Sequence, residues 1–109
     1  MNRNDYQNII TQPRDKNIIF YFGETWCKPC KTVKPIVMSK IENLKNNIIF
    51  HDIDVDDNFD VYAYLKKNKV VTGIPTLLLY DQKTTTPIAP KFSCSGTNNL
   101  DLFFSNINI

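Results

Sequence analysis

The stretch from Asn17 to Asn46 restricts the fold more than any other part of the chain. It begins with NIIFYF, an unbroken run of β-branched and aromatic residues that predicts a strand buried on both faces. From Lys28 to Asn46 the apolar residues recur at helical spacing, and Pro29 stands in the first turn, where its missing N–H costs little. Pro35 lies inside this pattern and is expected to kink the helix. A buried strand followed by a long helix indicates a layered α/β fold.

The rest of the sequence continues to alternate helix-like and strand-like segments. We expect a short helix over residues 5–11, a second strand in NIIFHDIDVDD, a shorter helix in NFDVYAYLKKN and a third strand in VVTGIPTLLLYD, after its Gly–Ile–Pro turn. A fourth strand is predicted in PIAPKFSCS, where Pro87 and Pro90 favour a sheet edge, and an amphipathic helix closes the chain. This order predicts parallel pairing at the first crossovers and an antiparallel last strand pair.

Length and charge narrow the class of protein. The 109 residues fit a single domain, 1–109. Thirteen basic and eleven acidic residues give a net charge of +2, which favours neither nucleic acid nor a membrane surface as a partner. The polar N-terminus lacks the apolar segment of a secretory signal, and the longest apolar runs are too short to cross a membrane. We therefore expect a cytoplasmic protein in a reducing compartment, where a CxxC motif is more often catalytic or metal-binding than structural.

The CxxC motif of Cys27 and Cys30 is compatible with a zinc site, a structural disulfide or a redox-active dithiol. A structural zinc site normally has four protein ligands, and the only other cysteine and histidine in the sequence are Cys94 and His51. These two residues lie in separate predicted elements, without the spacing typical of zinc sites, so no metal is expected. A reducing compartment argues against a permanent disulfide. The pattern therefore favours a reversible dithiol.

The predicted position of Cys27 suits a nucleophile. Cys27 follows a buried strand and opens a helix, so its sulfur should lie near unpaired N–H groups and the positive end of the helix dipole, which favour a thiolate. Cys30 lies about one helical turn further on, within reach of Cys27 but shielded. Pro29 stiffens the turn between the two cysteines, and the positive charge of Lys28 should favour the thiolate further.

The sequence WCKPCK, Pro35 in the helix and GIPT from Gly73 to Thr76 resemble the thioredoxin family, more than glutaredoxins or disulfide isomerases. The resemblance runs from about Asn17 to the C-terminus. It implies the thioredoxin fold, an α/β architecture with a central mixed sheet of four to five strands and helices on both faces. It also implies a thiol–disulfide oxidoreductase that reduces protein disulfides, with a part in electron transport and cell redox homeostasis.

By this resemblance, Cys27 is the nucleophile, Cys30 resolves the mixed disulfide, and Trp26 flanks the pair as an apolar rim for the substrate. Pro75 is expected to be a cis proline facing the dithiol, and the backbone of Ile74 to pair with an extended substrate segment. The redox-active disulfide is the only expected cofactor, so a separate thioredoxin-reductase-like protein must donate the electrons. A monomer is expected. Two other functions stay open: a disulfide donor or isomerase with a raised potential, and a non-enzymatic thioredoxin-fold binding subunit.

Three features depart from the family pattern. Thioredoxins usually place a buried Asp six residues before the nucleophilic cysteine, where this chain has Tyr21, a poor base at neutral pH. We expect Asp52 to act instead through a water molecule, with Tyr21 as its hydrogen-bond partner. Lys28 replaces the usual Gly and should make the reduction potential less negative, unless the Glu24 carboxylate lies close by. Because the predicted dithiol comes early in the chain, the first edge strand of the family is expected to be absent or short.

Two further groups of residues have structural interpretations. A buried cysteine outside a disulfide behaves as a small hydrophobic residue, and this role is favoured for Cys94 over that of a regulatory thiol. The acidic residues after the second predicted strand resemble a cation site, but we expect them to end the strand and cap the next helix. They are Asp52, Asp54, Asp56 and Asp57.

Overall fold

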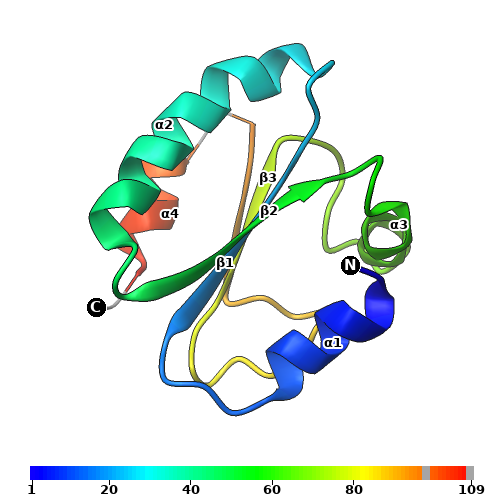
Figure 1. Ribbon diagram of the computed structural model, residues 1–109, viewed down its shortest axis with the longest axis vertical. Helices are drawn as coiled ribbons and strands as arrows, with labels where there is room; N and C mark the ends of the chain where they lie inside the picture. The colour runs from blue at the N-terminus through cyan, green and yellow to red at the C-terminus, as the bar shows by residue number, and fades with distance from the viewer. Residues whose placement is uncertain (97–98, 108–109) are drawn as a thin grey trace.

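A computed structural model of the protein describes residues 1–96 and 99–107. Helices and strands follow one another along the chain in the predicted order (Figure 1). They are α1 (Arg3–Thr11), β1 (Asn17–Gly23), α2 (Lys28–Leu44), β2 (Ile48–Asp54), α3 (Phe59–Lys67), β3 (Thr76–Tyr80), β4 (Phe92–Ser95) and α4 (Leu100–Ser105). The fourth strand is shorter than predicted: it begins at Phe92, after Pro87 and Pro90. Proline has no N–H to donate to a strand ladder, which explains why neither proline lies within the strand. No helix within the described part of the chain is long and apolar enough to cross a membrane.

The strands form a mixed sheet with the order β2-β1-β3-β4. β1 pairs in parallel with β2 and antiparallel with β3, and β4 pairs antiparallel with β3 at the sheet edge. The parallel pairing predicted for the first crossover and the antiparallel last pair are therefore confirmed. The same prediction for the next crossover, through α3, is wrong, because β3 enters the sheet antiparallel to β1. Within the described residues the sheet has four strands, the lower end of the expected range, and α1 precedes its first strand.

The helices cover the two faces of the sheet in pairs (Figure 1). α1 and α3 pack on one face, where Tyr6 and Leu65 belong to the same buried cluster. α2 and α4 pack on the other face, where the buried cluster includes Val37 and Phe103. Burying each such side chain contributes about 1.5–3 kcal/mol, so both faces of the sheet stabilise the fold.

The composition of β1 follows from its central place. All seven of its residues are buried, because strands flank it on both sides and helices cover both of its faces. Its side chains alternate between the two clusters: Phe20 and Phe22 face α1 and α3, whereas Tyr21 faces α2. The tyrosine is thus placed beneath the helix that carries the two cysteines.

Candidate functional site

Cys27 and Cys30 form a disulfide at the N-terminus of α2, with their Cα atoms 5.2 Å apart. Cys27 is the N-cap residue, and its Sγ accepts a hydrogen bond of 3.2 Å from the backbone N–H of Cys30. The exposed fraction is 6% for Cys27 and 2% for Cys30, so the first cysteine is the more accessible of two nearly buried residues. A sulfur that receives a helix N–H can be stabilised as a thiolate once the disulfide is reduced.

Trp26 lies beside the disulfide with 65% of its surface exposed. Its Nε1–H donates a hydrogen bond of 3.0 Å to a carboxylate oxygen of Asp56, in the turn after β2. This bond fixes an exposed apolar surface next to the dithiol. The sequence analysis considered Asp56 only among the acidic residues that end the second strand and cap the next helix. The parallel pairing of β2 with β1, which brings the ends of both strands to the same edge of the sheet, was the signal for this contact.

The loop before β3 reaches the same end of the sheet as the disulfide. The Ile74–Pro75 peptide bond is cis, and Pro75 is buried. The β1–β3 register pairs Phe22 with Thr76, which puts this loop next to the end of β1. The Pro75 carbonyl accepts a hydrogen bond of 3.0 Å from the Gly96 N–H, which ties the loop to the end of β4. The cis bond expected at Pro75 is therefore present, whereas the contact of Pro75 with the dithiol and the pairing of Ile74 with substrate stay predictions.

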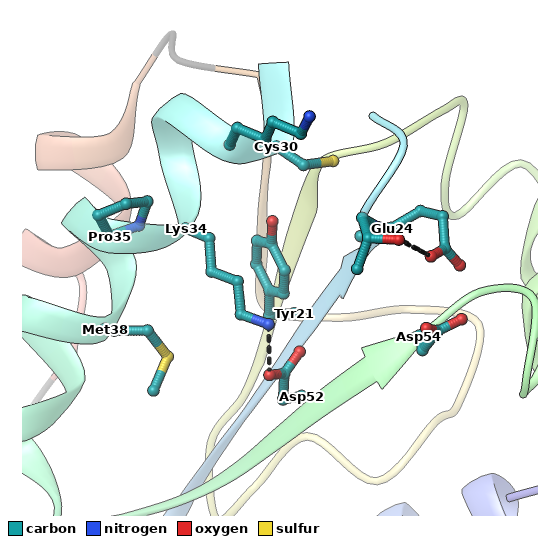
Figure 2. Close-up of a pocket in the computed structure, with 11 residues that line it drawn as sticks. Tyr21, Glu24, Cys30, Lys34, Pro35, Met38, Asp52 and Asp54 are labelled. Carbon is teal, nitrogen blue, oxygen red and sulfur yellow. Dashed lines mark hydrogen bonds and ion pairs between the residues drawn. The ribbon is translucent and has the colours of Figure 1, made fainter. Parts of the chain in front are cut away.

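A pocket of about 560 Å³ opens between α2 and the ends of β1 and β2 (Figure 2). Its lining brings together three of the predicted site residues, Cys30, Tyr21 and Asp52. The remaining lining residues are Gly23, Glu24, Thr25, Lys31, Lys34, Pro35, Met38 and Asp54. Figure 2 shows the ring of Tyr21 extending from β1 with its hydroxyl end toward the helix turn that carries Cys30.

The expected hydrogen bond between Tyr21 and Asp52 is wrong. The Tyr21 hydroxyl is buried and has no hydrogen-bond partner among the described residues. The Asp52 carboxylate instead forms an ion pair of 2.9 Å with Lys34 Nζ, which also lies over the Tyr21 ring, 5.9 Å from its centroid. Burial, and secondarily the negative charge of Asp52, raise the pKa of Tyr21 to about 12, so the phenol is neutral at physiological pH. Sequence reasoning missed Lys34 because its spacing shows only an exposed helix position.

The charged residues around the motif are arranged as follows. Lys28 is exposed at the start of α2, and Pro29 occupies the first turn. The Glu24 carboxylate accepts a hydrogen bond of 2.8 Å from the Thr25 N–H. A hydrogen bond with Asp54 raises the pKa of Glu24, so the Glu24 carboxyl group is engaged with the last residue of β2.

Three carboxylates come close enough to share a cation within the described residues, those of Glu24, Asp54 and Asp56. Each has protein partners: Asp54 accepts from the Asp56 and Asp57 N–H groups at 2.9 and 3.1 Å, and Asp56 accepts from Trp26. These contacts order the turn between β2 and α3, so the acidic segment ends the strand as expected. The expected cap of the next helix is wrong, because Asn58 is the N-cap residue of α3 and its side chain makes no cap hydrogen bond.

Cys94 lies on the core side of β4, 3% exposed, in the cluster that contains Leu77 and Phe103. Burial raises the pKa of its thiol, which disfavours the reactive thiolate. Its placement agrees with the interpretation of Cys94 as a small core residue. His51 is half-buried and stacks on Phe20 with ring centroids 5.0 Å apart, away from the cysteines of the motif.

Comparisons with known proteins agree with this geometry. The family model for thioredoxin matches residues 1–108. Thioredoxin of Pongo abelii is 38% identical over 78 residues, which cover 72% of this chain and 69% of that protein. Thioredoxin of Oryctolagus cuniculus is 38% identical over 58 residues, and the chain spans about half of its length, 54%. The solved structure of Trichomonas vaginalis thioredoxin superposes with a TM-score of 0.74 at 21% identity, over 96% of this chain and 90% of the Trichomonas chain. At this identity the similarity supports the fold alone.

Proposed function

Because the chain belongs to the thioredoxin family, we propose that it is a thiol–disulfide oxidoreductase that reduces protein disulfides through Cys27 and Cys30. The observation that carries this proposal is the Cys27–Cys30 disulfide at the N-terminus of α2, where Cys27 Sγ receives the Cys30 N–H. A helix N-terminus stabilises negative charge, and the thiolate is the form of cysteine that attacks disulfides.

The reaction proceeds in two exchanges. The Cys27 thiolate attacks one sulfur of the substrate disulfide, and the other substrate sulfur leaves with the electron pair and takes a proton. Cys30 then attacks Cys27 Sγ, the bond between Cys27 and the substrate breaks, and the second substrate sulfur leaves as a thiolate. The substrate disulfide is reduced to two thiols, and the Cys27–Cys30 pair is oxidised to the disulfide present in the structure.

Residues around the dithiol receive supporting roles in this proposal. The exposed Trp26 presents an apolar surface to the substrate, and the backbone of Ile74, before the buried Pro75, pairs with an extended substrate segment. Pro29 stiffens the turn between the cysteines, and Lys28 raises the reduction potential by favouring the thiolate. Asp52, which lines the same pocket as Cys30, accepts the Cys30 proton through a water molecule.

We extend the proposal to the partners of the protein. The substrates are disulfide-containing proteins, and a separate thioredoxin-reductase-like protein returns the oxidised pair to the dithiol. No cofactor beyond the redox-active disulfide is required by this chemistry. We place the protein, as a monomer, in the cytoplasm and in cellular electron transport and redox homeostasis.

The test is the reduction of a disulfide-bonded protein such as insulin, with dithiothreitol as the electron source. Cys27→Ser should abolish catalysis, whereas Cys30→Ser should stop after one exchange and leave the substrate covalently attached through Cys27. Cys94→Ala is the matched control for loss of a thiol and should retain the rate, because Cys94 lies in the core. Catalysis by the Cys27→Ser variant at the normal rate would overturn the proposal.

A further inference from the structure

The Tyr21 hydroxyl is a buried polar group in the candidate site, next to the disulfide. Its side chain is 1% exposed, and the oxygen has no hydrogen-bond partner among the described residues. Buried polar groups are nearly always paired, because an unpaired one costs stability. An exception inside a candidate active site therefore requires a functional explanation, such as a partner that exists in another state of the reaction.

The geometry indicates which atom that partner is. Tyr21 and Cys30 line the same pocket, and the hydroxyl end of the tyrosine points toward the helix turn of Cys30 (Figure 2). The Tyr21 ring lies against Gly23, the next residue on the same face of β1, where a larger side chain would collide with the ring. A Cβ atom at position 23 would lie 2.7 Å from both Cε2 and the hydroxyl oxygen of Tyr21.

A thiolate at Cys30 would have to be stabilised by a hydrogen-bond donor inside the pocket. Cys30 is 2% exposed, so its thiolate would lose nearly all of its hydration. The charged groups lining the pocket are Lys31 and Lys34 from α2, Asp52 and Asp54 from β2, and Glu24 from the loop after β1. Lys34 is already paired with Asp52, and the neutral phenol of Tyr21 can donate a hydrogen bond without adding charge.

We propose that the Tyr21 hydroxyl donates a hydrogen bond to the Cys30 thiolate and thereby promotes release of the substrate. The inference rests on the proposed function, since the Cys30 thiolate is the group that attacks Cys27 Sγ in the mixed disulfide. In that step the Cys30–Cys27 bond forms, the bond between Cys27 and the substrate breaks, and the electron pair leaves with the substrate sulfur. The proton that Cys30 lost beforehand has passed through a water molecule to the carboxylate of Asp52, which lines the same pocket. Tyr21 keeps its own proton throughout.

The first test measures Cys30 directly. In a Cys27→Ser/Cys94→Ala protein, Cys30 is the single thiol, and its alkylation by iodoacetamide is followed against pH. Adding Tyr21→Phe removes only the hydroxyl and keeps the ring beneath Lys34. The midpoint of the pH profile should rise by about one to two pH units, the effect of losing one hydrogen bond to a charged group.

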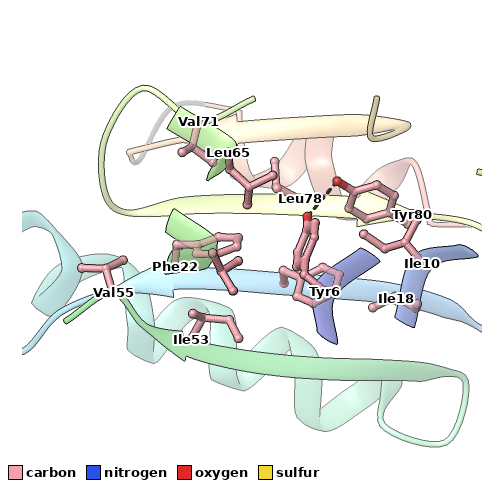
Figure 3. Close-up of a cluster of buried hydrophobic side chains, with 12 residues drawn as sticks. Tyr6, Ile10, Ile18, Phe22, Ile53, Val55, Leu65, Val71, Leu78 and Tyr80 are labelled. Carbon is pink, nitrogen blue, oxygen red and sulfur yellow. Dashed lines mark hydrogen bonds between the residues drawn. The ribbon is translucent and has the colours of Figure 1, made fainter. Parts of the chain in front are cut away.

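A matched control removes a different buried hydroxyl. Tyr6 lies on the opposite face of the sheet, where its hydroxyl pairs with that of Tyr80 at 2.7 Å (Figure 3). Tyr6→Phe loses a real hydrogen bond and should still leave the Cys30 midpoint unchanged. Gly23→Ala is a second variant that retains the Tyr21 hydroxyl but displaces it, and it should move the midpoint in the same direction as Tyr21→Phe.

The second test separates the two exchanges in time. When the reduced protein is mixed with 5,5′-dithiobis(2-nitrobenzoate), the first thionitrobenzoate is released by Cys27 attack and the second by Cys30 attack. Tyr21→Phe should leave the first phase intact and slow the second about 3- to 10-fold at pH 7. The effect on the rate is smaller than that on ionisation, because a more basic thiolate is also a better nucleophile.

The outcomes distinguish a failure of the role of Tyr21 from a failure of the proposed function. An unchanged midpoint in Tyr21→Phe, or an equal shift in Tyr6→Phe, would overturn the role of Tyr21. If the midpoint shifts but the native protein reduces no protein disulfide, the proposed function fails and the hydrogen bond to Cys30 stands.

Discussion

Replacing Tyr21 by phenylalanine should stabilise the oxidised protein, because the buried Tyr21 hydroxyl has no hydrogen-bond partner in the part of the chain that the structure describes. An unsatisfied buried hydroxyl costs about 1–3 kcal/mol, and the ring itself stays packed in the variant. We therefore expect the free energy of unfolding to rise by about 1 kcal/mol at pH 7. Tyr6→Phe deletes a hydroxyl that has a partner, and it should lower the free energy of unfolding by about 1 kcal/mol.

The difference between Tyr21→Phe and the native protein should grow in alkaline solution. The pKa of Tyr21 is raised from 10 to about 12 in the folded state by burial and by the charge of Asp52. A raised pKa means that the native protein has its full stability below pH 10 and loses it as the pH rises toward 12. At pH 11 the unfolded phenol is mostly ionised and the folded one mostly protonated, a loss of about 1.4 kcal/mol that the phenylalanine variant avoids.

Urea unfolding of the oxidised proteins at pH 7, 9, 10 and 11 provides the measurement. All variants should carry Cys94→Ala, because an unfolded thiolate would attack the disulfide in alkaline solution. At each pH, the free energy of unfolding of Tyr21→Phe is subtracted from that of the protein with Tyr21. This difference removes the contribution of the other tyrosines, which both proteins share. If Tyr21→Phe is less stable than the native protein at pH 7, or if the difference stays constant between pH 9 and 11, the Tyr21 hydroxyl does not destabilise the folded protein in this way.

Three further predictions concern the surroundings of the dithiol. Asp56→Ala removes the 3.0 Å bond to Trp26 and should change the tryptophan fluorescence and slow protein-disulfide reduction a few-fold; unchanged fluorescence would contradict the contact. Lys28→Gly should make the reduction potential more negative by about 5–20 mV, the size expected of an exposed charge, and an increase would reverse the assigned sign. Asp52→Asn should slow the Cys30 release phase, and an identical rate would remove Asp52 from proton transfer.

The arrangement of helices and strands could be predicted because it depends on local patterns. The run NIIFYF indicates a strand covered on both faces, and β1 is fully buried. A cysteine between this strand and a helical pattern had to lie at the helix N-terminus, and Cys27 is the N-cap of α2. These conclusions need only the sequence periods and the handedness of strand–helix–strand connections.

Contacts between side chains of different elements could not be predicted in the same way. The sequence predicts that Tyr21 and Asp52 lie on neighbouring strands. The β1–β2 register confirms this and makes their Cα atoms direct neighbours, although their side chains form no hydrogen bond. It does not show that Lys34 reaches down from α2 to bind the Asp52 carboxylate. A lysine at an exposed helix position has several rotamers, and only the fold determines which carboxylate lies within its reach. The Trp26–Asp56 bond was missed for the same reason.

The central claim is that the Cys27–Cys30 pair serves as a reductant of protein disulfides. Its most direct test is the reduction potential, measured by equilibrating the protein with glutathione buffers at pH 7 and trapping the thiols. The account predicts a value close to that of thioredoxin, about −270 mV, raised by no more than about 20 mV by Lys28. A value of about −200 mV or higher would contradict it and indicate a protein that donates or rearranges disulfides.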